Sequence, residues 1–226
     1  MRKIYSVAVD GPSGAGKSTL SKAVAAELGI VYVDTGAIYR TIGYYVFSKN
    51  IDPKDAAAVI AVLPQLEIEM RYADDGLQHM YLNGQDVTKE IRLPQISMYA
   101  SNVSAIPEVR TFLLEMQREM ARRSCVIMDG RDIGTVVLPD AEVKIFLTAD
   151  VEVRAQRRWE ELRQRGTERP YKEVLREMEE RDFNDSHRAA APLKQADDAV
   201  LVETSVLGFE ESKAKMLQVI REKVGI

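Results

Sequence analysis

Short apolar runs separated by polar turns organise the first 34 residues of the chain. Ile4 to Val9 is rich in β-branched residues, as expected of a strand buried on both faces of a parallel sheet. From Lys17 to Leu28 the apolar positions recur at helical spacing, and Gly29 then provides a C-terminal stop. Ile30 to Val33 predicts a second short strand. This opening therefore predicts a strand–loop–helix–strand unit, the start of an α/β fold.

The middle of the chain changes to an alternating pattern, which predicts a hairpin. Leu66 to Arg71 alternates, Asp74-Asp75-Gly76 supplies a turn, and Met80 to Leu82 runs into Asn83-Gly84. We therefore expect a small antiparallel patch inserted into an otherwise α/β chain.

The second half returns to helical and buried-strand patterns. Pro107 to Arg123 carries an apolar stripe at helical spacing, and three further strands are expected, at Val126 to Met128, Val143 to Leu147 and Ala199 to Val202. With the two strands of the opening, these make a five-stranded parallel sheet.

Between the last two strands, Val151 to Arg188 is the most charged part of the chain. Arginines and glutamates are interleaved there, and Gly166 divides the segment into two predicted helices. The pattern is typical of a mobile lid, and equally of a surface helical hairpin held by ion pairs one turn apart.

The composition excludes some partners and places the protein in a broad class. A chain of 226 residues with 46% hydrophobic and 29% charged residues is ordinary for a soluble globular protein. The net charge of −4 gives no support to a nucleic acid or an anionic membrane as partner. The single cysteine, Cys125, rules out an internal disulfide, and no stretch approaches the ~20 apolar residues of a spanning helix. We expect a cytoplasmic monomer.

The segment between the first strand and the first helix contains a phosphate-binding motif. Gly11 to Ser18 matches the pattern G-x-x-x-x-G-K-[ST], and it follows a predicted strand and opens a predicted helix, as a P-loop must. Lys17 is expected to reach the β- and γ-phosphates of a nucleoside triphosphate, and the Ser18 hydroxyl to bind Mg²⁺. The residues expected to hold the phosphates of ATP are Gly11, Pro12, Ser13, Gly14, Ala15, Gly16, Lys17, Ser18 and Thr19.

A P-loop alone does not identify the acceptor, because GTPases, motors and small-molecule kinases all contain one. The Asn-Lys-x-Asp run of GTPases is missing, and the chain is short for a motor. Clusters that combine arginine with a carboxylate or hydroxyl follow three predicted elements, at 34–40, 129–135 and 181–188. Ligands bind at the carboxyl ends of strands in open α/β sheets. The clusters therefore predict an acceptor that carries both a phosphate and polar groups.

Asp129 ends one of these strands. It is predicted to hold Mg²⁺ through water, and the alternative is a turn-forming aspartate before Gly130.

These motifs resemble those of bacterial cytidylate kinases, a family of nucleoside monophosphate kinases. The resemblance rests on GPSGAGK, DTGAIYR, DGRDIGTVV and the R-D-x-x-D-x-x-R run, in that order from Val7 to about Leu193. Ser18 departs from the glycine that family members often have, and serine is the better Mg²⁺ ligand.

The resemblance implies a P-loop NTPase fold with a three-layer α/β/α core, a five-stranded parallel sheet, an inserted NMP-binding region with a small antiparallel sheet, and a helical lid. The core would comprise residues 1–34, 106–150 and 182–226, the insert 35–105 and the lid 151–181, all within one domain unit. The implied reaction transfers the γ-phosphoryl group of ATP to CMP or dCMP, giving CDP or dCDP plus ADP.

The resemblance also implies a role for each matching position. The residues implied to bind CMP are Thr35, Tyr39, Arg40, Ser101, Arg110, Arg131, Asp132, Arg181, Asp185 and Arg188. Thr35, Tyr39 and Arg40 would lie along the monophosphate pocket, where Arg40 and Arg131 would hold the phosphate.

The other members of this set would bind the nucleoside. Ser101, Arg110 and Asp132 would address the cytosine ring. Arg181 and Asp185 would hold the ribose, with Arg188 between phosphate and base.

The catalytic charge would come from the P-loop, the acceptor side and the lid. The residues implied in catalysis are Lys17, Arg131, Arg154, Arg157 and Arg158, the last three in the lid. Which of the three lid arginines contacts the transferring group is left open.

The chemistry of the base supports this reading of Asp132. Cytosine offers an amine donor beside ring acceptors, whereas uracil would place a carbonyl against the carboxylate, so UMP should be rejected.

Two alternative functions remain: a P-loop kinase for another metabolite, and a regulatory module that hydrolyses ATP slowly. The clustered polar groups argue against the second, because a switch needs no acceptor pocket.

Overall fold

The computed structural model describes residues 4–72, 78–164 and 166–226. The predicted turn at Asp74-Asp75-Gly76 lies outside the described residues. The chain divides into two compact units, one made of Met1–Tyr32 and Ala121–Ile226 and the other of Val33–Met120. The residues expected as an insert, 35–105, lie within the second unit, and those expected as a lid, 151–181, belong to the first. The separation into core, insert and lid remains a prediction.

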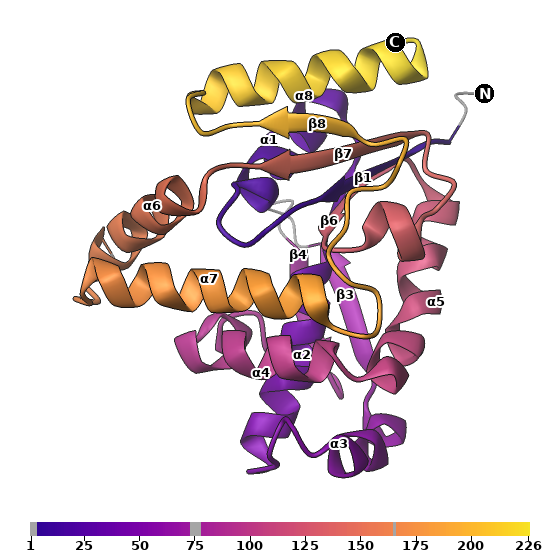
Figure 1. Ribbon diagram of the computed structural model, residues 1–226. Coiled ribbons are helices and arrows are strands. Elements are labelled where there is room, and N and C mark those ends of the chain that lie inside the picture. Colours follow the sequence, from indigo (N-terminus) through magenta and orange to yellow (C-terminus); the bar gives the residue numbers. More distant parts are fainter. Residues whose placement is uncertain (1–3, 73–77, 165) are drawn as a thin grey trace. The chain divides into compact units, whose positions relative to one another are not determined.

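The first unit is built on a five-stranded sheet (Figure 1). In spatial order its strands are β2 (Val31–Asp34), β6 (Val126–Gly130), β1 (Ser6–Asp10), β7 (Val143–Thr148) and β8 (Val200–Glu203). β1 pairs in parallel with β6 and β7, and β7 pairs in parallel with β8. The predicted five-stranded parallel sheet is therefore confirmed.

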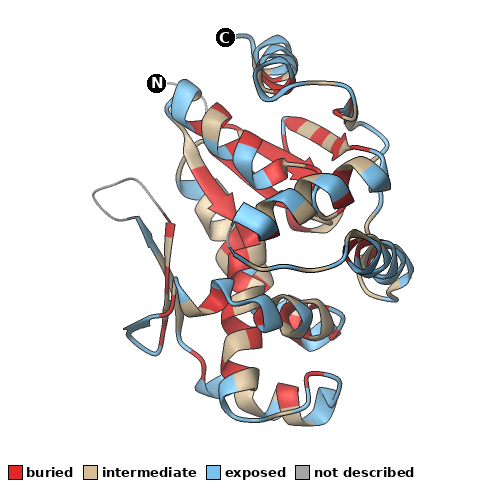
Figure 2. Ribbon diagram, turned by 90° about the vertical axis from the view of Figure 1, so that its left-hand side faces the viewer, coloured by how far each residue is buried: buried red, intermediate tan, exposed pale blue. Residues whose placement is uncertain are grey.

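Both faces of the central strands β1 and β6 are buried, which explains their continuous apolar runs (Figure 2). Successive side chains of a strand point to opposite faces, so Val7 and Val9 face one side and Ala8 the other, and all three are fully buried. Helices α1 (Lys17–Leu28) and α8 (Phe209–Val224) contribute Val24 and Met216 to the core on the Val7 side.

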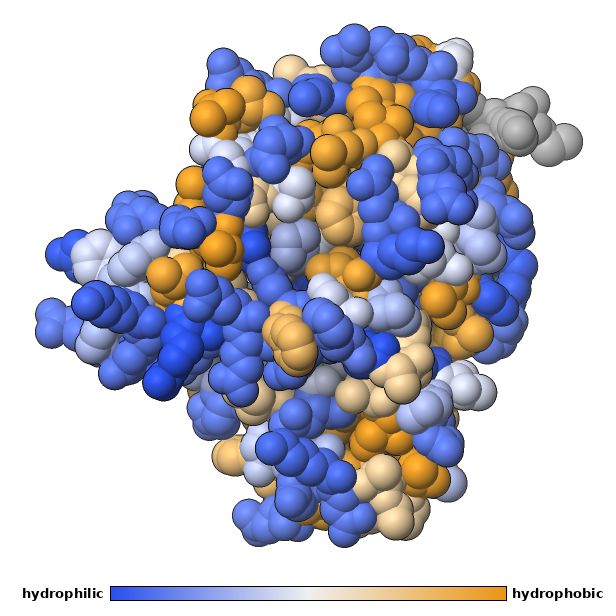
Figure 3. Space-filling model, viewed as in Figure 1, coloured by the Kyte–Doolittle hydropathy of each residue, from blue (hydrophilic) through white to orange (hydrophobic). Residues whose placement is uncertain are grey.

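The charged segment before β8 forms two helices, as predicted. α6 (Val151–Gln164) and α7 (Tyr171–His187) are separated by a turn in which Gly166 has a φ of +74°. Their outer surface is strongly hydrophilic (Figure 3), and Arg169, just before α7, pairs with Glu173 and Glu177 of that helix. These ion pairs are those of a surface hairpin, whereas movement of the hairpin as a lid remains a prediction.

The second unit contains the predicted antiparallel patch together with several helices. The patch is a three-stranded sheet of β3 (Ile68–Tyr72), β4 (Gln78–Leu82) and β5 (Gln85–Asp86), in which β3 and β4 pair antiparallel. The helices are α2 (Thr35–Ser48), α3 (Ala56–Val62), α4 (Pro94–Ser104) and α5 (Pro107–Arg123), with short turns η1 (Leu63–Gln65) and η2 (Glu90–Arg92). α2 packs closely on α4, where a Cβ added to Gly43 would lie 2.8 Å from the Ala100 nitrogen.

One further element matters for the site. η3 (Ile133–Val137) is a single π-helical turn that follows β6, and it packs against β1.

In the described parts of the chain, no helix combines the length and the apolar character needed to cross a membrane.

Candidate active site

The P-loop joins the central strand to the first helix, as the sequence predicts. β1 ends at Asp10 and α1 begins at Lys17. Gly11 has a φ of +148°, and a Cβ at this position would lie 1.9 Å from the Leu147 carbonyl oxygen. The loop therefore requires glycine at Gly11, because any side chain would collide with the backbone of β7.

Lys17 lies folded against the loop that precedes it. Its Nζ donates to the carbonyl oxygens of Gly11, at 2.8 Å, and Pro12, at 2.7 Å. Burial, with the charge of Arg131, lowers the pKa of Lys17 well below its ordinary value, and the carboxylates of Asp129 and Asp10 oppose that shift. The ammonium is thus held at the loop, where it can contact an anion bound to the backbone amides.

Ser18 and Asp129 meet beside the P-loop. The Ser18 hydroxyl donates to Oδ2 of Asp129 at 2.8 Å, and the Tyr32 phenol donates to Oδ1 at 2.9 Å. A hydroxyl next to a carboxylate suits Mg²⁺, which takes oxygen ligands and keeps waters and phosphate oxygens in its remaining positions. Within the described residues, no group of three or more His, Cys, Asp or Glu could bind a metal by itself. The donor set therefore fits an ion held jointly with a nucleotide.

Arg154, predicted as a lid arginine, is buried under the P-loop. Its guanidinium donates to the carbonyl oxygens of Ala149, at 2.7 Å, and Ser13, at 2.9 Å, and it pairs with Asp182 of α7 at 2.7 Å. Arg154 therefore ties α6, the P-loop and α7 together.

The other two predicted lid arginines have different partners. Arg157 donates to the Thr204 carbonyl oxygen at 2.7 Å, and Arg158 pairs with Glu161 of its own helix.

The first unit brings several predicted acceptor residues together. Arg131 donates to Asp185 at 2.7 Å, and Arg188 lies 3.4 Å from Oδ1 of Asp132. Burial by itself would raise the pKa of Asp185, but the charges of Arg131 and Arg181 outweigh it and hold that pKa below its ordinary value. Asp185 is therefore a carboxylate surrounded by arginines.

In the second unit, the predicted residues lie on α2, α4 and α5. The Arg110 guanidinium lies over the Tyr39 ring, 5.4 Å from its centroid, and donates to the Ser104 carbonyl oxygen at 3.1 Å. Thr35 is the buried first residue of α2, and Ser101 lies on α4, where its carbonyl oxygen accepts from the Ser104 hydroxyl.

Arg40 lies at the start of α2, near a carboxylate that caps the helix. Asp34 accepts from the Ala37 amide at 2.9 Å, and its Oδ2 lies 3.8 Å from Arg40 and 3.0 Å from Arg92. Burial alone would raise the pKa of Asp34, but the two arginines and the amide lower it overall. Asp34 thus caps α2 and lies within ion-pair distance of the arginine expected on the acceptor phosphate.

Sequence reasoning missed several residues of this arrangement: Asp10, Tyr32, Arg92 and Asp182. Asp10 carries a signal that sequence reasoning could have used, because a carboxylate at the buried end of the strand that enters a P-loop needs partners. Tyr32, Arg92 and Asp182 carry no local signal, because their partners lie 97, 58 and 28 residues away in the chain, at Asp129, Asp34 and Arg154.

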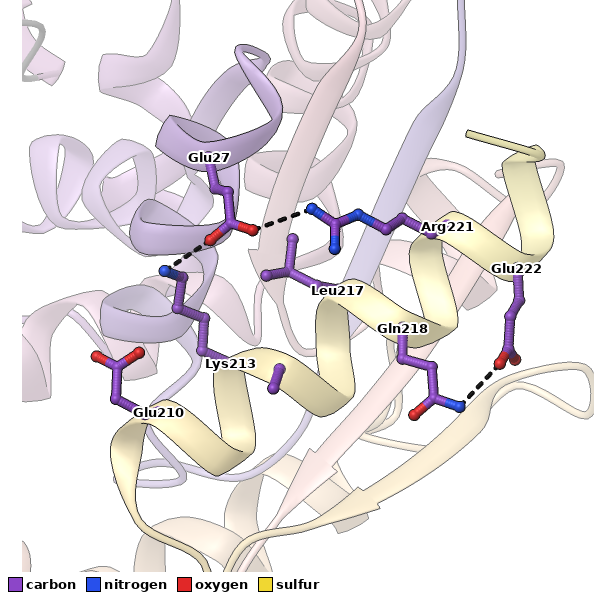
Figure 4. A pocket seen from close by; sticks show the side chains of 8 residues that line it. Glu27, Glu210, Lys213, Leu217, Gln218, Arg221 and Glu222 are labelled. Carbon is purple, nitrogen blue, oxygen red and sulfur yellow. Dashed lines mark hydrogen bonds and ion pairs between the residues drawn. The ribbon is translucent and has the colours of Figure 1, made fainter.

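A surface pocket between α1 and α8 does not belong to this site (Figure 4). Its charged side chains pair with one another: Glu27 accepts from Arg221 at 3.0 Å and pairs with Lys213 at 2.7 Å. Glu27 lies on the last turn of α1, roughly 15 Å along the helix axis from Lys17. The pocket is therefore a place where ion pairs join α1 to α8.

The chain is similar to known proteins over nearly its whole length. The family model for cytidylate kinase matches residues 7–222. A cytidylate kinase of Caldicellulosiruptor bescii is 49% identical, over 99% of this chain and 98% of the relative. One of Fervidobacterium nodosum is 47% identical, over 97% and 98%, and one of Flavobacterium johnsoniae is 46% identical, over the full length of both chains.

Solved structures share the fold at low identity. A gluconokinase from Sinorhizobium meliloti 1021 has a TM-score of 0.50 at 16% identity, covering 100% of this chain and 97% of its own. An uncharacterised protein from Eubacterium ventriosum has a TM-score of 0.55 at 12% identity, covering 97% and 99%. The relatives at 46–49% identity carry the assignment, and the resemblance seen in the motifs is confirmed: this chain belongs to the cytidylate kinase family.

Proposed function

We propose that this chain transfers the γ-phosphoryl group of ATP to CMP or dCMP, giving CDP or dCDP plus ADP. The observation that carries the proposal is the match to the cytidylate kinase family over residues 7–222, which includes the P-loop and the acidic and arginine clusters at the strand ends.

On the donor side, the P-loop amides and Lys17 would hold the phosphates of ATP, with the positive end of the α1 dipole directed at them. Ser18, and Asp129 through water, would hold Mg²⁺, which would neutralise charge on the phosphates. Tyr32 supports this arrangement because it fixes the second oxygen of Asp129.

On the acceptor side, Arg40 and Arg131 would bind the phosphate of CMP, with Thr35 and Tyr39 along the same pocket. Ser101, Arg110 and Asp132 would read the cytosine ring, Arg181 and Asp185 would hold the ribose, and Arg188 would lie between phosphate and base. The ion pair of Arg131 with Asp185, at 2.7 Å, supports this assignment because it holds the two charged side chains together just after the end of β6.

Phosphoryl transfer requires little covalent chemistry from the protein. Catalysis here would consist of positioning the two nucleotides and stabilising the charge of the transition state. Lys17 and Arg131 would supply positive charge to the transferring group, and Arg154, Arg157 and Arg158 would act from α6. Closure of α6 and α7 over the site would exclude water, which competes with CMP as acceptor.

The direct test is a coupled assay of ADP production with CMP, dCMP, UMP, AMP or no acceptor, with chromatography to identify the nucleoside diphosphate formed. CMP and dCMP should raise ADP production well above the acceptor-free rate and yield CDP and dCDP. A rate with CMP equal to the acceptor-free rate would overturn the proposal, and the slow ATPase reading would replace it.

The reading of the base is tested by Asp132→Ala. This variant should lose the preference for CMP over UMP while its ATP affinity is unchanged, because a buried carboxylate facing a carbonyl oxygen costs ~1–3 kcal/mol or more. Asp198→Ala is the control, since Asp198 is an exposed carboxylate of the same unit that pairs with Lys144. Selectivity retained in Asp132→Ala would show that the base is read elsewhere.

A further inference from the structure

Asp10 is a buried carboxylate to which the proposed mechanism gives no role. It is the last residue of β1 and immediately precedes Gly11, and its side chain binds the segment after β6. Its Oδ1 accepts from the Ile133 amide at 2.7 Å and its Oδ2 from the Gly134 amide at 2.7 Å. One carboxylate therefore binds two successive amides more than 120 residues away.

These two amides open the π-helical turn η3, where backbone N–H groups have no partner within the turn. Asp10 supplies those partners from a neighbouring strand, as a capping side chain normally does from within its own segment. Charge-assisted hydrogen bonds of this kind are roughly twice as strong as neutral ones. The start of η3 is therefore fixed to the end of β1.

The residues immediately before η3 are Arg131 and Asp132. The Asp132 carbonyl oxygen accepts from the Val136 amide at 2.9 Å, and the next amide along the chain, that of Ile133, donates to Asp10. The backbone on the carboxyl side of Asp132 is thus held by both bonds, and the Asp132 carboxylate lies 3.4 Å from Arg188.

Close packing around Gly134 confirms how tightly this contact is made. A Cβ added at Gly134 would lie 3.3 Å from Oδ2 of Asp10 and 3.1 Å from Cδ of Lys144. Alanine at this position would have to push the carboxylate or the lysine away.

We propose that Asp10 is a positioning residue that holds the Arg131–Gly134 segment in place, and that it thereby sets the selectivity for CMP over UMP through Asp132. The proposal rests on the proposed function, since it assumes that Asp132 reads the base. Asp10 also joins the donor and acceptor sides of the first unit, because the residue that it precedes, Gly11, begins the P-loop.

The test is Asp10→Asn, which keeps the shape of the side chain but replaces one acceptor oxygen with an NH₂ group that cannot accept. The ratio of kcat/KM for CMP to that for UMP should fall at least about tenfold, the loss expected for one hydrogen bond to a charged group. The Kd for ATP should change by less than about twofold. Hydrogen exchange should be faster at the Ile133 and Gly134 amides than in the parent protein.

The double variant with Asp132→Ala separates positioning from general support of the fold. If Asp10 acts through Asp132, adding Asp10→Asn to Asp132→Ala leaves the selectivity ratio where Asp132→Ala alone put it. A structural role alone would lower kcat/KM for both acceptors equally in the single variant, and that result would overturn the proposal, as would an unchanged ratio.

Two further variants keep the test decisive. Gly134→Ala disturbs the same contact from the other side without changing any charge, so it should show a milder loss of selectivity even if Asp10→Asn fails to fold. Glu142→Gln is the matched control, because Glu142 accepts from the Ser6 amide at 2.9 Å at the opposite end of β1, and it should keep the parent ratio. A parent protein without CMP activity would reject the proposed function, whereas a selective parent with an equally selective Asp10→Asn would reject only this inference.

Discussion

At the scale of single residues, both carboxylate oxygens of Asp129 accept hydrogen bonds from side chains of distant elements. Ser18, on the first turn of α1, holds one oxygen, and Tyr32, on β2, holds the other. The motif predicts that Ser18 is a metal ligand, but nothing in the sequence assigns Tyr32 a role. Groups that orient a metal's ligands commonly matter nearly as much as the ligands themselves.

Tyr32→Phe removes the oxygen that holds Oδ1 of Asp129. We expect it to raise the Mg²⁺ concentration needed for ATP binding by about tenfold, because Asp129 loses the partner that orients it. We also expect it to lower the free energy of unfolding by about 1 kcal/mol. A Mg²⁺ titration with a fluorescent ATP analogue measures the first quantity, and urea unfolding the second.

Tyr45→Phe is the matched control, because the buried Tyr45 hydroxyl donates to Gln65 at 3.2 Å in the second unit. It should reduce stability by a similar amount and leave the Mg²⁺ titration unchanged. If both variants leave that titration unchanged, Tyr32 serves stability alone.

At the scale of elements, α6 and α7 are joined to the P-loop by a single buried guanidinium. Arg154 binds Ser13 in the loop and Asp182 on α7, and its Cβ would lie 3.2 Å from a Cβ added at Gly14. The charge pattern of this segment left a mobile lid and a surface hairpin equally open. The contacts show that the base of the hairpin is anchored, and they leave closure of its outer part as a prediction.

Arg154→Lys distinguishes anchoring from direct catalysis. Lysine cannot bind three partners in the fork geometry of arginine, so we expect weaker ATP binding and a free energy of unfolding lower by about 1–3 kcal/mol. Hydrogen exchange of α7 should also become faster. A purely catalytic arginine would instead lower kcat and leave ATP affinity and stability unchanged. Arg163→Lys is the control, since Arg163 lies over the Trp159 ring of its own helix.

At the scale of the whole molecule, buried carboxylates make stability depend on pH in opposite directions. Burial raises the pKa of Asp10 to about 6, against an ordinary value of 3.8. The hydrogen bonds from the Gly134 and Ile133 amides and the charge of Lys17 oppose this shift, and the charge of Asp132 adds to it. The pKa values of Asp34 and Asp185 are lowered instead. Their contributions to stability are therefore present at neutral pH and are lost only below pH ~4.

The sign of the Asp10 contribution follows from its raised pKa. Between pH 3.8 and about 6 the folded state binds the Asp10 proton more tightly than the unfolded state does. The contribution of Asp10 to the free energy of unfolding is therefore largest below pH ~4 and is lost as the pH rises through about 6. We therefore expect the parent protein to gain stability over Asp10→Asn on acidification from pH 7 to pH 5, by up to about 1.4 kcal/mol per pH unit. Urea midpoints of the two proteins across that range measure it, and a parallel pH dependence would contradict the shift.

Several elements were predictable because their signals are local. The P-loop requires glycines and a lysine within eight consecutive positions, and the strands of the parallel sheet are short apolar runs. α1 has the predicted bounds for the same reason: its apolar positions repeat at helical spacing up to Gly29. α2 was not predicted, because it begins with Thr35 and Gly36, which have poor intrinsic helix propensity. It forms because Asp34 caps it and because α4 packs against it.

The sequence by itself determined the fold class, the donor loop and the family, because each of these depends on residue types at fixed spacing along the chain. Tertiary structure alone decided which distant residues meet around the predicted site: Asp10 with Ile133, Tyr32 with Asp129, and Arg154 with Ser13. Those partners are 123, 97 and 141 residues apart. They meet because β6 lies between β2 and β1, and β1 between β6 and β7, in the five-stranded sheet. The packing of the whole core sets this strand order, and no single segment does.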